Sequence, residues 1–310
     1  MSELFTLAVL QGILYSGIRL ATPYLYAALG ETLGQTSGVL NLGVEGIMLM
    51  GAYSGFYVGI QTGNLWLGLL AAAAVGALLG LVMAVISVTL RAEQGISGIG
   101  MALFGLGLSS LLFKKTLGSV ESIRGFQPIK IPVLGDIPFI GDVLFNHNIM
   151  VYGAFLLVPV MTWVIDRTTF GLKVRAAGQN PQAADTLGVN INRLRYITII
   201  TGGVMAGIAG ASLSIALINL FQENMTNGIG FIAVALVYFG GWRPVGVLAG
   251  ALLFSLVSAL QLWIQVKGIA LPSDIAVMMP YILTILALAF AMRRIQQPAA
   301  LTKPFERGES

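Results

Sequence analysis

The sequence predicts an all-α protein that crosses a membrane many times. Of its 310 residues, 56% are hydrophobic and only 10% are charged, whereas about a quarter of a typical soluble protein is charged. Five stretches carry no charge at all, at 46–90, 94–113, 196–222, 244–266 and 275–292. Each is near or above the roughly 18 to 20 residues that a transmembrane helix needs. We therefore expect a single transmembrane domain over residues 1–310.

About nine transmembrane helices, with a range of eight to ten, follow from these stretches, of which 46–90 is long enough for two, together with the apolar runs at 4–29 and 148–165 and a short run at 231–240. The run at 231–240 is too short to cross a hydrocarbon core of roughly 30 Å as one helix. A broken or re-entrant span is expected there, since such breaks are tolerated against protein or a water-filled cavity. The many glycines of 94–113 predict irregular helix in that span as well.

Small-residue spacing predicts close packing between helices. Glycines at 51, 55 and 59 form two overlapping G-x-x-x-G steps, and similar steps occur at 76–80, 203–207 and 206–210. Such residues let helix backbones approach closely in a membrane. These motifs therefore indicate packing and not chemistry.

Two charged residues are expected inside the membrane. Arg19 lies near the middle of the first span, where a charge costs about 2.5 to 3.5 kcal/mol on insertion scales. It is either a pathway or gating charge, or it belongs to a structural ion pair or snorkels towards the membrane surface. Glu45 shares a helix face with Asn41, four residues earlier. Glu45 is either functional, or it lies at the membrane interface or forms an intramembrane ion pair with Arg19.

A polar stretch at 166–195 interrupts the apolar chain and holds five of its seventeen basic residues. Its centre carries helix signals of its own: Asn180 can cap, Pro181 suits the first position, and Gly188 can end the helix. We predict a short helix that stands outside the membrane and contacts a partner.

The distribution of basic residues orients the chain. Eleven lie on the side of the 166–195 loop and the C-terminus, five lie in loops on the other side, and Arg19 lies in the membrane. Because loops rich in Lys and Arg face the cytoplasm, the C-terminus is expected to be cytoplasmic. The net charge of +4 is explained by this topology, and no nucleic-acid partner is expected.

The other long segment outside the spans, 114–146, contains a near-repeat, IPVLGD followed by IPFIGD. Proline in each copy argues against helix, so we expect an extended segment that lies over one membrane face. It either receives an external partner or covers the ends of helices.

Signatures of catalysis are absent from the sequence. The chain has no cysteine and only one histidine, His147, which argues against thiol chemistry, metal sites and catalytic triads. The nucleotide-binding motif G-x-x-x-x-G-K-[ST] is absent too, as are H-E-x-x-H and G-x-S-x-G. We predict a non-catalytic membrane subunit without a cofactor of its own. Active transport would then draw on an ion gradient or on a separate ATPase, and the displayed helix favours the ATPase.

Four segments in collinear order carry a family resemblance: RLATPYLYAALGE at 19–31, SGVLNLGVEGIMLMGA at 37–52, RAAGQNPQAADTLGVN at 175–190 and LPSDIAVMMPYILTILALA at 271–289. The chain resembles, over nearly its whole length, the permease subunit of a bacterial ABC importer of the simple-sugar and nucleoside branch. The resemblance implies a fold similar to vitamin B12-type importer permeases, in the cytoplasmic (inner) membrane. Two sites depart from the family pattern: Gln179 replaces a frequent glutamate, and Gln35-Thr36 replaces a frequent glutamate-arginine pair.

The resemblance also implies partners. These are cytoplasmic ABC ATPase subunits that bind ATP and Mg, a second permease subunit in a homo- or heterodimer, and an external substrate-binding protein or lipoprotein. The cytoplasmic 166–195 loop resembles the coupling segment that sits in a groove of the ATPase. The matching residues are Arg175, Ala176, Ala177, Gly178, Asn180, Pro181, Ala183, Ala184, Asp185 and Gly188.

A nucleoside is the predicted substrate, because the ending at 271–289 looks closer to that sub-branch. A simple sugar such as ribose or galactose is the alternative, and an ion-coupled secondary carrier is the alternative from another class. A nucleoside needs amide or carboxyl partners and rings for stacking. The candidate pathway residues are Asn41, Glu45, Phe104, Asn219, Gln222 and Gln261, although the amides among them could instead bridge neighbouring helices.

Overall fold

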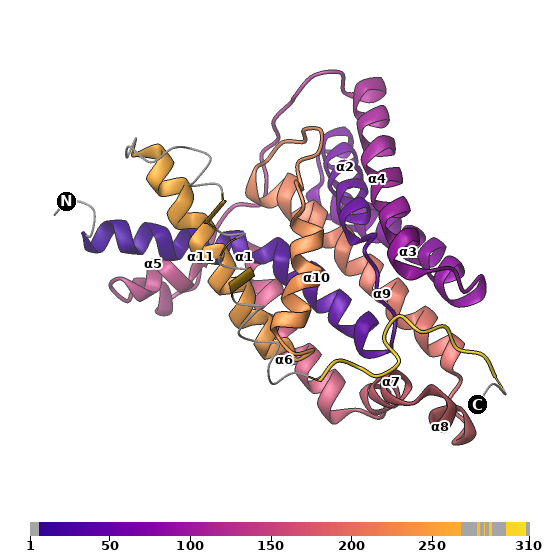
Figure 1. Cartoon of the computed structure of the whole chain (residues 1–310). Helices are drawn as coiled ribbons and strands as arrows, with labels where there is room; N and C mark the ends of the chain where they lie inside the picture. The colour runs from indigo at the N-terminus through magenta and orange to yellow at the C-terminus, as the bar shows by residue number, and fades with distance from the viewer. Residues whose placement is uncertain (1–5, 268–277, 280–281, 283–284, 287–295, 308–310) are drawn as a thin grey trace.

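The computed structural model describes residues 6–267, 278–279, 282, 285–286 and 296–307, and it is a bundle of long helices (Figure 1). Its α-helices are α1 (Leu7–Thr36), α2 (Val44–Thr62), α3 (Leu65–Ala84), α4 (Gln94–Thr116), α5 (Ile140–Leu144), α6 (Ile149–Arg167), α7 (Thr169–Gln179), α8 (Pro181–Thr186), α9 (Ile191–Ser212), α10 (Ile229–Phe239) and α11 (Pro244–Val266). Short elements complete it: η2 (Val85–Thr89), η3 (Leu134–Asp136) and η4 (Leu213–Leu217), with strands β1 (Ile129–Lys130) and β2 (Asn146–His147). The span predicted at 275–292 lies outside the described residues, apart from a few isolated positions.

Five helices within the described residues are long and apolar enough to cross a membrane: α3 with η2, α4, α6, α9 with η4, and α11. The central one is α9, because 78% of its most apolar window is buried, against 33% in each of the other four. The outer helices expose large apolar side chains such as Leu70, Leu103 and Leu156. This architecture is that of an all-α polytopic membrane protein.

The crossing of α3 and α9 depends on glycine. A Cβ atom on Gly76 would lie 2.3 Å from the carbonyl oxygen of Gly203, and one on Gly203 would lie 2.4 Å from the carbonyl oxygen of Gly76. Gly80 and Gly207 pack at the same crossing. The predicted small-residue steps are thus confirmed as packing motifs.

The prediction of irregular helix at 94–113 is wrong, because α4 is one continuous helix. Its glycines allow close contact instead: Gly98 lies against Leu42, and Gly105 lies against Gly46 of α2. Glycine costs about 1 kcal/mol relative to alanine in a helix. In a membrane the backbone has no water to bond to, so the helical hydrogen bonds outweigh this cost.

The run at 231–240 forms the short helix α10, which is separate from the central helix, as a broken or re-entrant span requires. The central helix continues through the π-helical turn η4 to Leu217, and α10 begins only at Ile229. The 11 residues of α10 span about 16 Å at 1.5 Å per residue, roughly half of the hydrocarbon core. The first turn of α2 is also inside the bundle, since a Cβ on Gly46 would lie 2.4 Å from the carbonyl oxygen of Met101 in α4. The start of α10 contacts the first turn of α2 inside the bundle.

The segment at 114–146 is only partly extended, which corrects the expectation from its prolines. In each copy of the near-repeat the proline is followed by a residue with positive φ, Val133 at 68° and Phe139 at 70°, and then by a helical turn, η3 or α5. Proline suits turns as well as extended chain. Strands β1 and β2 pair antiparallel and set Ile129 opposite His147. Burial lowers the pKa of His147, whose ring stacks on Tyr15 of α1 at 4.7 Å.

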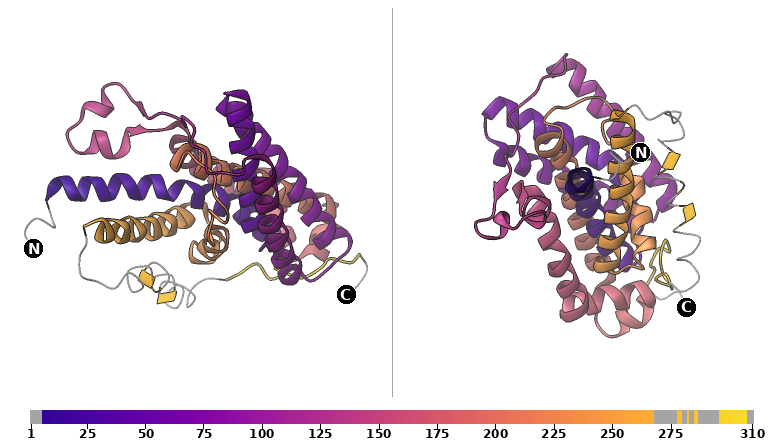
Figure 2. Two further views of the ribbon diagram at one scale, coloured as in Figure 1. Left: turned by 90° about the horizontal axis from the view of Figure 1, so that it is seen from above. Right: turned by 90° about the vertical axis from the view of Figure 1, so that its left-hand side faces the viewer.

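One end of the bundle carries α7, α8 and the C-terminal segment 296–307 (Figure 1). We call this end the α7–α8 face. The start of α1 and the short helix α5 lie at the opposite end of the bundle from the α7–α8 face (Figure 2). Helix α7 was not predicted, although the hydroxyl of Thr168 caps it by accepting from the backbone N–H of Gly171 at 3.0 Å.

Candidate functional site

Glu45, in the first turn of α2, holds the start of α10. Its carboxylate accepts hydrogen bonds from the hydroxyl of Thr226 at 2.5 Å and from the backbone N–H groups of Gly228 at 2.8 Å and Gly230 at 2.6 Å. The side chain is buried. The first N–H groups of a helix lack partners within it and carry partial positive charge. Glu45 therefore satisfies these donors and balances their charge inside the bundle.

Arg19 and Glu45 do not form the expected ion pair. The Nη2 of Arg19 instead donates to the carbonyl oxygen of Leu217 at 3.4 Å, and its guanidinium lies 5.7 Å from the ring centre of Tyr15. Leu217 ends η4, where carbonyl groups lack helical partners and a cation is favourable. Each charge therefore caps one of the two helix ends that the break exposes. The ion-pair hypothesis considered only the opposite charge as a partner for Arg19 and Glu45. It did not consider the unpaired backbone groups at helix ends, which are their partners in the structure.

The candidate pathway residues divide by position. Asn41 and Glu45 lie at the start of α2, and Asn219 and Gln222 lie between η4 and α10. Asn219 has a φ of 63°, and its side-chain oxygen is buried without a hydrogen-bond partner among the described residues. Phe104 is 52% exposed on α4, and Gln261 is half-buried on α11. Glu45 bonds to the segment before α10, and a pathway through the six residues stays a prediction.

A buried polar network near the end of α1 was missed from the sequence. Gln35 Nε2 donates to Glu31 at 3.1 Å, and the same carboxylate accepts from the backbone N–H of Asn41 at 2.9 Å. Gln35 Oε1 accepts from the indole of Trp242 at 2.9 Å. Because Gln35 both donates and accepts, a glutamate at this position would set a second carboxylate against Glu31. The sequence feature that indicates this network is Glu31 itself, a charged residue at the end of an apolar run.

The cap chemistry predicted for α8 is confirmed. Asn180 Oδ1 accepts from the backbone N–H of Ala183 at 3.0 Å, Pro181 occupies the first position, and Gly188 has a φ of +83°. This is the left-handed conformation that glycine adopts without strain. Leu187, between the helix and this glycine, is 84% exposed.

The predicted coupling residues have two different environments. Ala177, Gly178, Pro181 and Ala184 are buried, whereas Arg175, Asn180, Ala183 and Gly188 are exposed, and Ala176 and Asp185 are intermediate. A Cβ on Gly178 would lie 2.0 Å from the carbonyl oxygen of Thr36, at the end of α1. The buried members therefore fix α7 and α8 to the bundle, and the exposed members are free to contact a partner.

The C-terminal segment 296–307, here called the C-terminal strap, crosses the α7–α8 face. Its backbone donates from Ala300 to Gly178 O at 2.9 Å and from Thr302 to Gly38 O at 3.1 Å. Arg195 of α9 is 1% exposed and donates to the carbonyl oxygens of Ser37 at 3.2 Å and Lys303 at 3.0 Å. A buried arginine therefore joins the strap, α9 and the end of α1.

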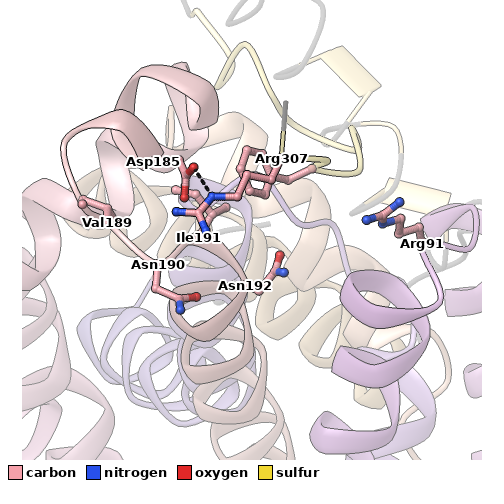
Figure 3. Close-up of a pocket in the computed structure, with 9 residues that line it drawn as sticks. Arg91, Asp185, Val189, Asn190, Ile191, Asn192 and Arg307 are labelled. Atoms are coloured by element: carbon pink, nitrogen blue, oxygen red, sulfur yellow. Dashed lines mark hydrogen bonds and ion pairs between the residues drawn. The ribbon is translucent and has the colours of Figure 1, made fainter. Parts of the chain in front are cut away.

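Two cavities lie on the α7–α8 face, and the strap lines both. One of about 520 Å³ is lined by Arg175, Arg243 and Pro298, among others. The other, of about 290 Å³, lies between α8, the start of α9 and the end of the strap (Figure 3). Its polar lining consists of Arg91, Asp185, Asn190, Asn192 and Arg307.

Apolar helices around a broken central span define a polytopic integral membrane protein. More particularly, the chain belongs to the family of branched-chain amino acid transport system permease components, whose model matches residues 13–288. It is 39% identical to the putative glucose ABC transporter permease protein TsgC13 of Haloferax volcanii, over 96% of this chain and 98% of that one. It is 34% identical to the guanosine ABC transporter permease protein NupQ of Bacillus subtilis (93% and 94% covered) and 33% identical to the nucleoside ABC transporter permease protein NupC of Lactococcus lactis (94% and 95%). No solved structure matches it significantly. The family resemblance drawn from the four sequence segments is confirmed.

Proposed function

We propose that this chain is the transmembrane permease subunit of an ABC importer, and that it carries a nucleoside across the cytoplasmic membrane with ATP hydrolysed by a separate subunit. The observation that carries this proposal is the displayed helix α8, which is capped at both ends and leaves Leu187 exposed. Covering this leucine with a partner would remove its apolar surface from water, which is favourable. The family supports the same function and favours it over an ion-coupled carrier.

The nucleoside is favoured by two relatives named for guanosine and for nucleosides, at 34% and 33% identity. A hexose is the second candidate, because the relative at 39% identity is named for glucose. The polar groups between η4 and α10 suit either candidate, because a hexose and a nucleoside both need hydrogen-bond partners. Asn219, whose buried side-chain oxygen has no partner among the described residues, is one such group.

In the proposed importer, the ATPase binds ATP and Mg and holds α7 and α8 in a groove. A second permease subunit completes the path, and an external binding protein delivers the substrate. The excess of basic residues on the α7–α8 side supports a cytoplasmic location for this face and the C-terminus. About nine spans, in a fold similar to vitamin B12-type permeases, belong to the same proposal.

Helix α1 would transmit the movement of the closing ATPase to the break between η4 and α10. Gly178 at the end of α7 packs on Thr36 at the end of α1, and Arg19 on the same helix caps η4. Because α1 is a single helix of 30 residues, a displacement of α7 and α8 would move it as a rigid body. The cap on η4 would then shift, and the path at the break would change shape.

Competition during uptake tests the substrate. Proteoliposomes would contain the permease with the ATPase and binding protein whose genes lie beside it. We expect labelled guanosine to accumulate, and excess unlabelled guanosine, but not glucose, to suppress the signal. Accumulation of labelled glucose without guanosine uptake would show that the substrate is a sugar and not a nucleoside.

A further inference from the structure

We infer that the C-terminal strap is part of the docking surface for the ATPase, and that the 290 Å³ cavity between the strap and α8 receives an acidic side chain of that subunit. This inference rests on the proposed function. It extends the docking surface beyond the 166–195 loop to a segment more than a hundred residues further along the chain.

The strap has a fixed place on this face. Ala300, Leu301 and Phe305 are 4%, 7% and 7% exposed, so the strap buries an apolar side against the bundle. Its end is held by charge: Glu306 pairs with Arg91, and Arg307 Nε donates to Asp185 of α8 at 2.8 Å. The strap and α8 therefore present one continuous surface to a partner.

The cavity offers more hydrogen-bond donors than acceptors. Arginine has five N–H donors, and Arg307, whose side chain is 80% exposed, contacts Asp185 only through Nε. Arg91, 44% exposed, reaches the cavity from the far side (Figure 3). The side-chain oxygen of Asn190 already accepts from the backbone N–H of Arg193, which leaves its NH₂ group to serve a ligand.

Each carboxylate here is paired with one of these arginines: Asp185, which lines the cavity, accepts from Arg307, and Glu306 of the strap pairs with Arg91. Each pair uses only part of the five N–H donors of its arginine, so the remaining donors are available to a ligand. The cavity also lies at the start of α9, a helix of 22 residues, where partial positive charge accumulates. A ligand that accepts several hydrogen bonds and carries negative charge fits best, and a carboxylate can take two parallel bonds from an arginine.

The other end of the strap continues the same chemistry. There it lines the 520 Å³ cavity together with Arg175 and Arg243. The lining of that cavity also includes one carboxylate, Asp166, so arginines outnumber carboxylates there by two to one. Leu187, directly after α8, is exposed on the same face. An acidic ATPase surface with an apolar residue that covers Leu187 is the partner that this arrangement fits.

Crosslinking tests the surface directly, since the chain has no cysteine of its own. Single-cysteine variants Arg307→Cys, Leu187→Cys and Val120→Cys would carry a photoactivatable group in the assembled complex with the ATPase. We expect crosslinks to the ATPase from positions 187 and 307 and none from 120, which is exposed but lies in the 114–146 segment. A crosslink from 187 without one from 307 would overturn the strap inference alone. The absence of both would also contradict the proposed function.

Charge reversal tests the acidic partner. Arg307→Glu should weaken ATPase association about tenfold, which corresponds to about 1.4 kcal/mol, with the amount of permease in the membrane unchanged. Lys303→Glu is the matched control, since it makes the same charge change on an exposed strap residue outside the cavity, and it should have a much smaller effect. Equal weakening by both variants would show that the effect comes from general surface charge, and it would overturn the inference of an acidic side chain in the cavity. An unchanged association of Arg307→Glu would overturn it as well.

Discussion

Replacing Glu45 with alanine is expected to abolish uptake and to lower the stability of the purified permease by at least about 3 kcal/mol. The change leaves three donors without an acceptor, on Thr226, Gly228 and Gly230. Each buried unsatisfied donor costs about 1 to 3 kcal/mol, and water is scarce at this depth. Thermal unfolding in detergent and uptake by proteoliposomes measure the two effects.

Glu93 provides a matched control. It caps the start of α4 in the same way, with bonds to the backbone N–H groups of Gly95 at 2.9 Å and Ile96 at 2.5 Å. These bonds lower the pKa of its carboxyl group, but the residue is exposed. Because water can replace the lost acceptor, Glu93→Ala should retain most uptake. Similar losses in the two alanine variants would contradict a special role for the buried cap at α10.

Leu187→Asp is expected to abolish substrate-stimulated ATP hydrolysis by the assembled complex, while the permease stays in the membrane with normal stability. The side chain is 84% exposed, so the substitution disturbs little within the chain itself. Burying a leucine contributes about 1.5 to 3 kcal/mol, and its loss weakens association tenfold or more. Measurement of ATPase activity with and without substrate tests this.

Two comparisons make that result specific. Val120→Asp, at another exposed apolar residue but in the 114–146 segment, should leave association with the ATPase intact, whereas Leu187→Asp should weaken it. Charged residues at Gly178 or Ala184 should uncouple the complex too, but they should also lower stability, since both positions are buried. If Leu187→Asp retains full stimulation, α8 is not the contact that the proposed function requires.

Local chemistry made much of this structure predictable. The cap at Asn180, the proline after it and the glycine at 188 predicted α8 almost residue by residue, because each satisfies a local backbone requirement. The short run at 231–240 likewise predicted a break, because length alone prevents it from crossing the membrane. The glycines of α3 and α9 predicted packing for a similar reason, since small residues spaced four apart let two helix backbones touch.

What failed depended on contacts between distant segments. An ion pair between Arg19 and Glu45 was one possibility because opposite charges attract, and nothing in the local sequence indicates that each caps a different helix end. The glycines of α4 predict an irregular helix, yet Gly98 and Gly105 allow close contact with Leu42 and with Gly46 of α2. The position of the strap could not be predicted for the same reason, since its partners Gly178 and Arg195 lie more than a hundred residues away in the sequence.

Energised uptake tests the central claim most directly. Proteoliposomes with ATP inside, the permease, its ATPase and its binding protein would be treated with ionophores that collapse every ion gradient. If the chain is an ABC permease, substrate uptake continues at an unchanged rate with ATP and stops when ATP is removed. Uptake that disappears with the gradient while ATP is present would contradict this account and favour an ion-coupled carrier.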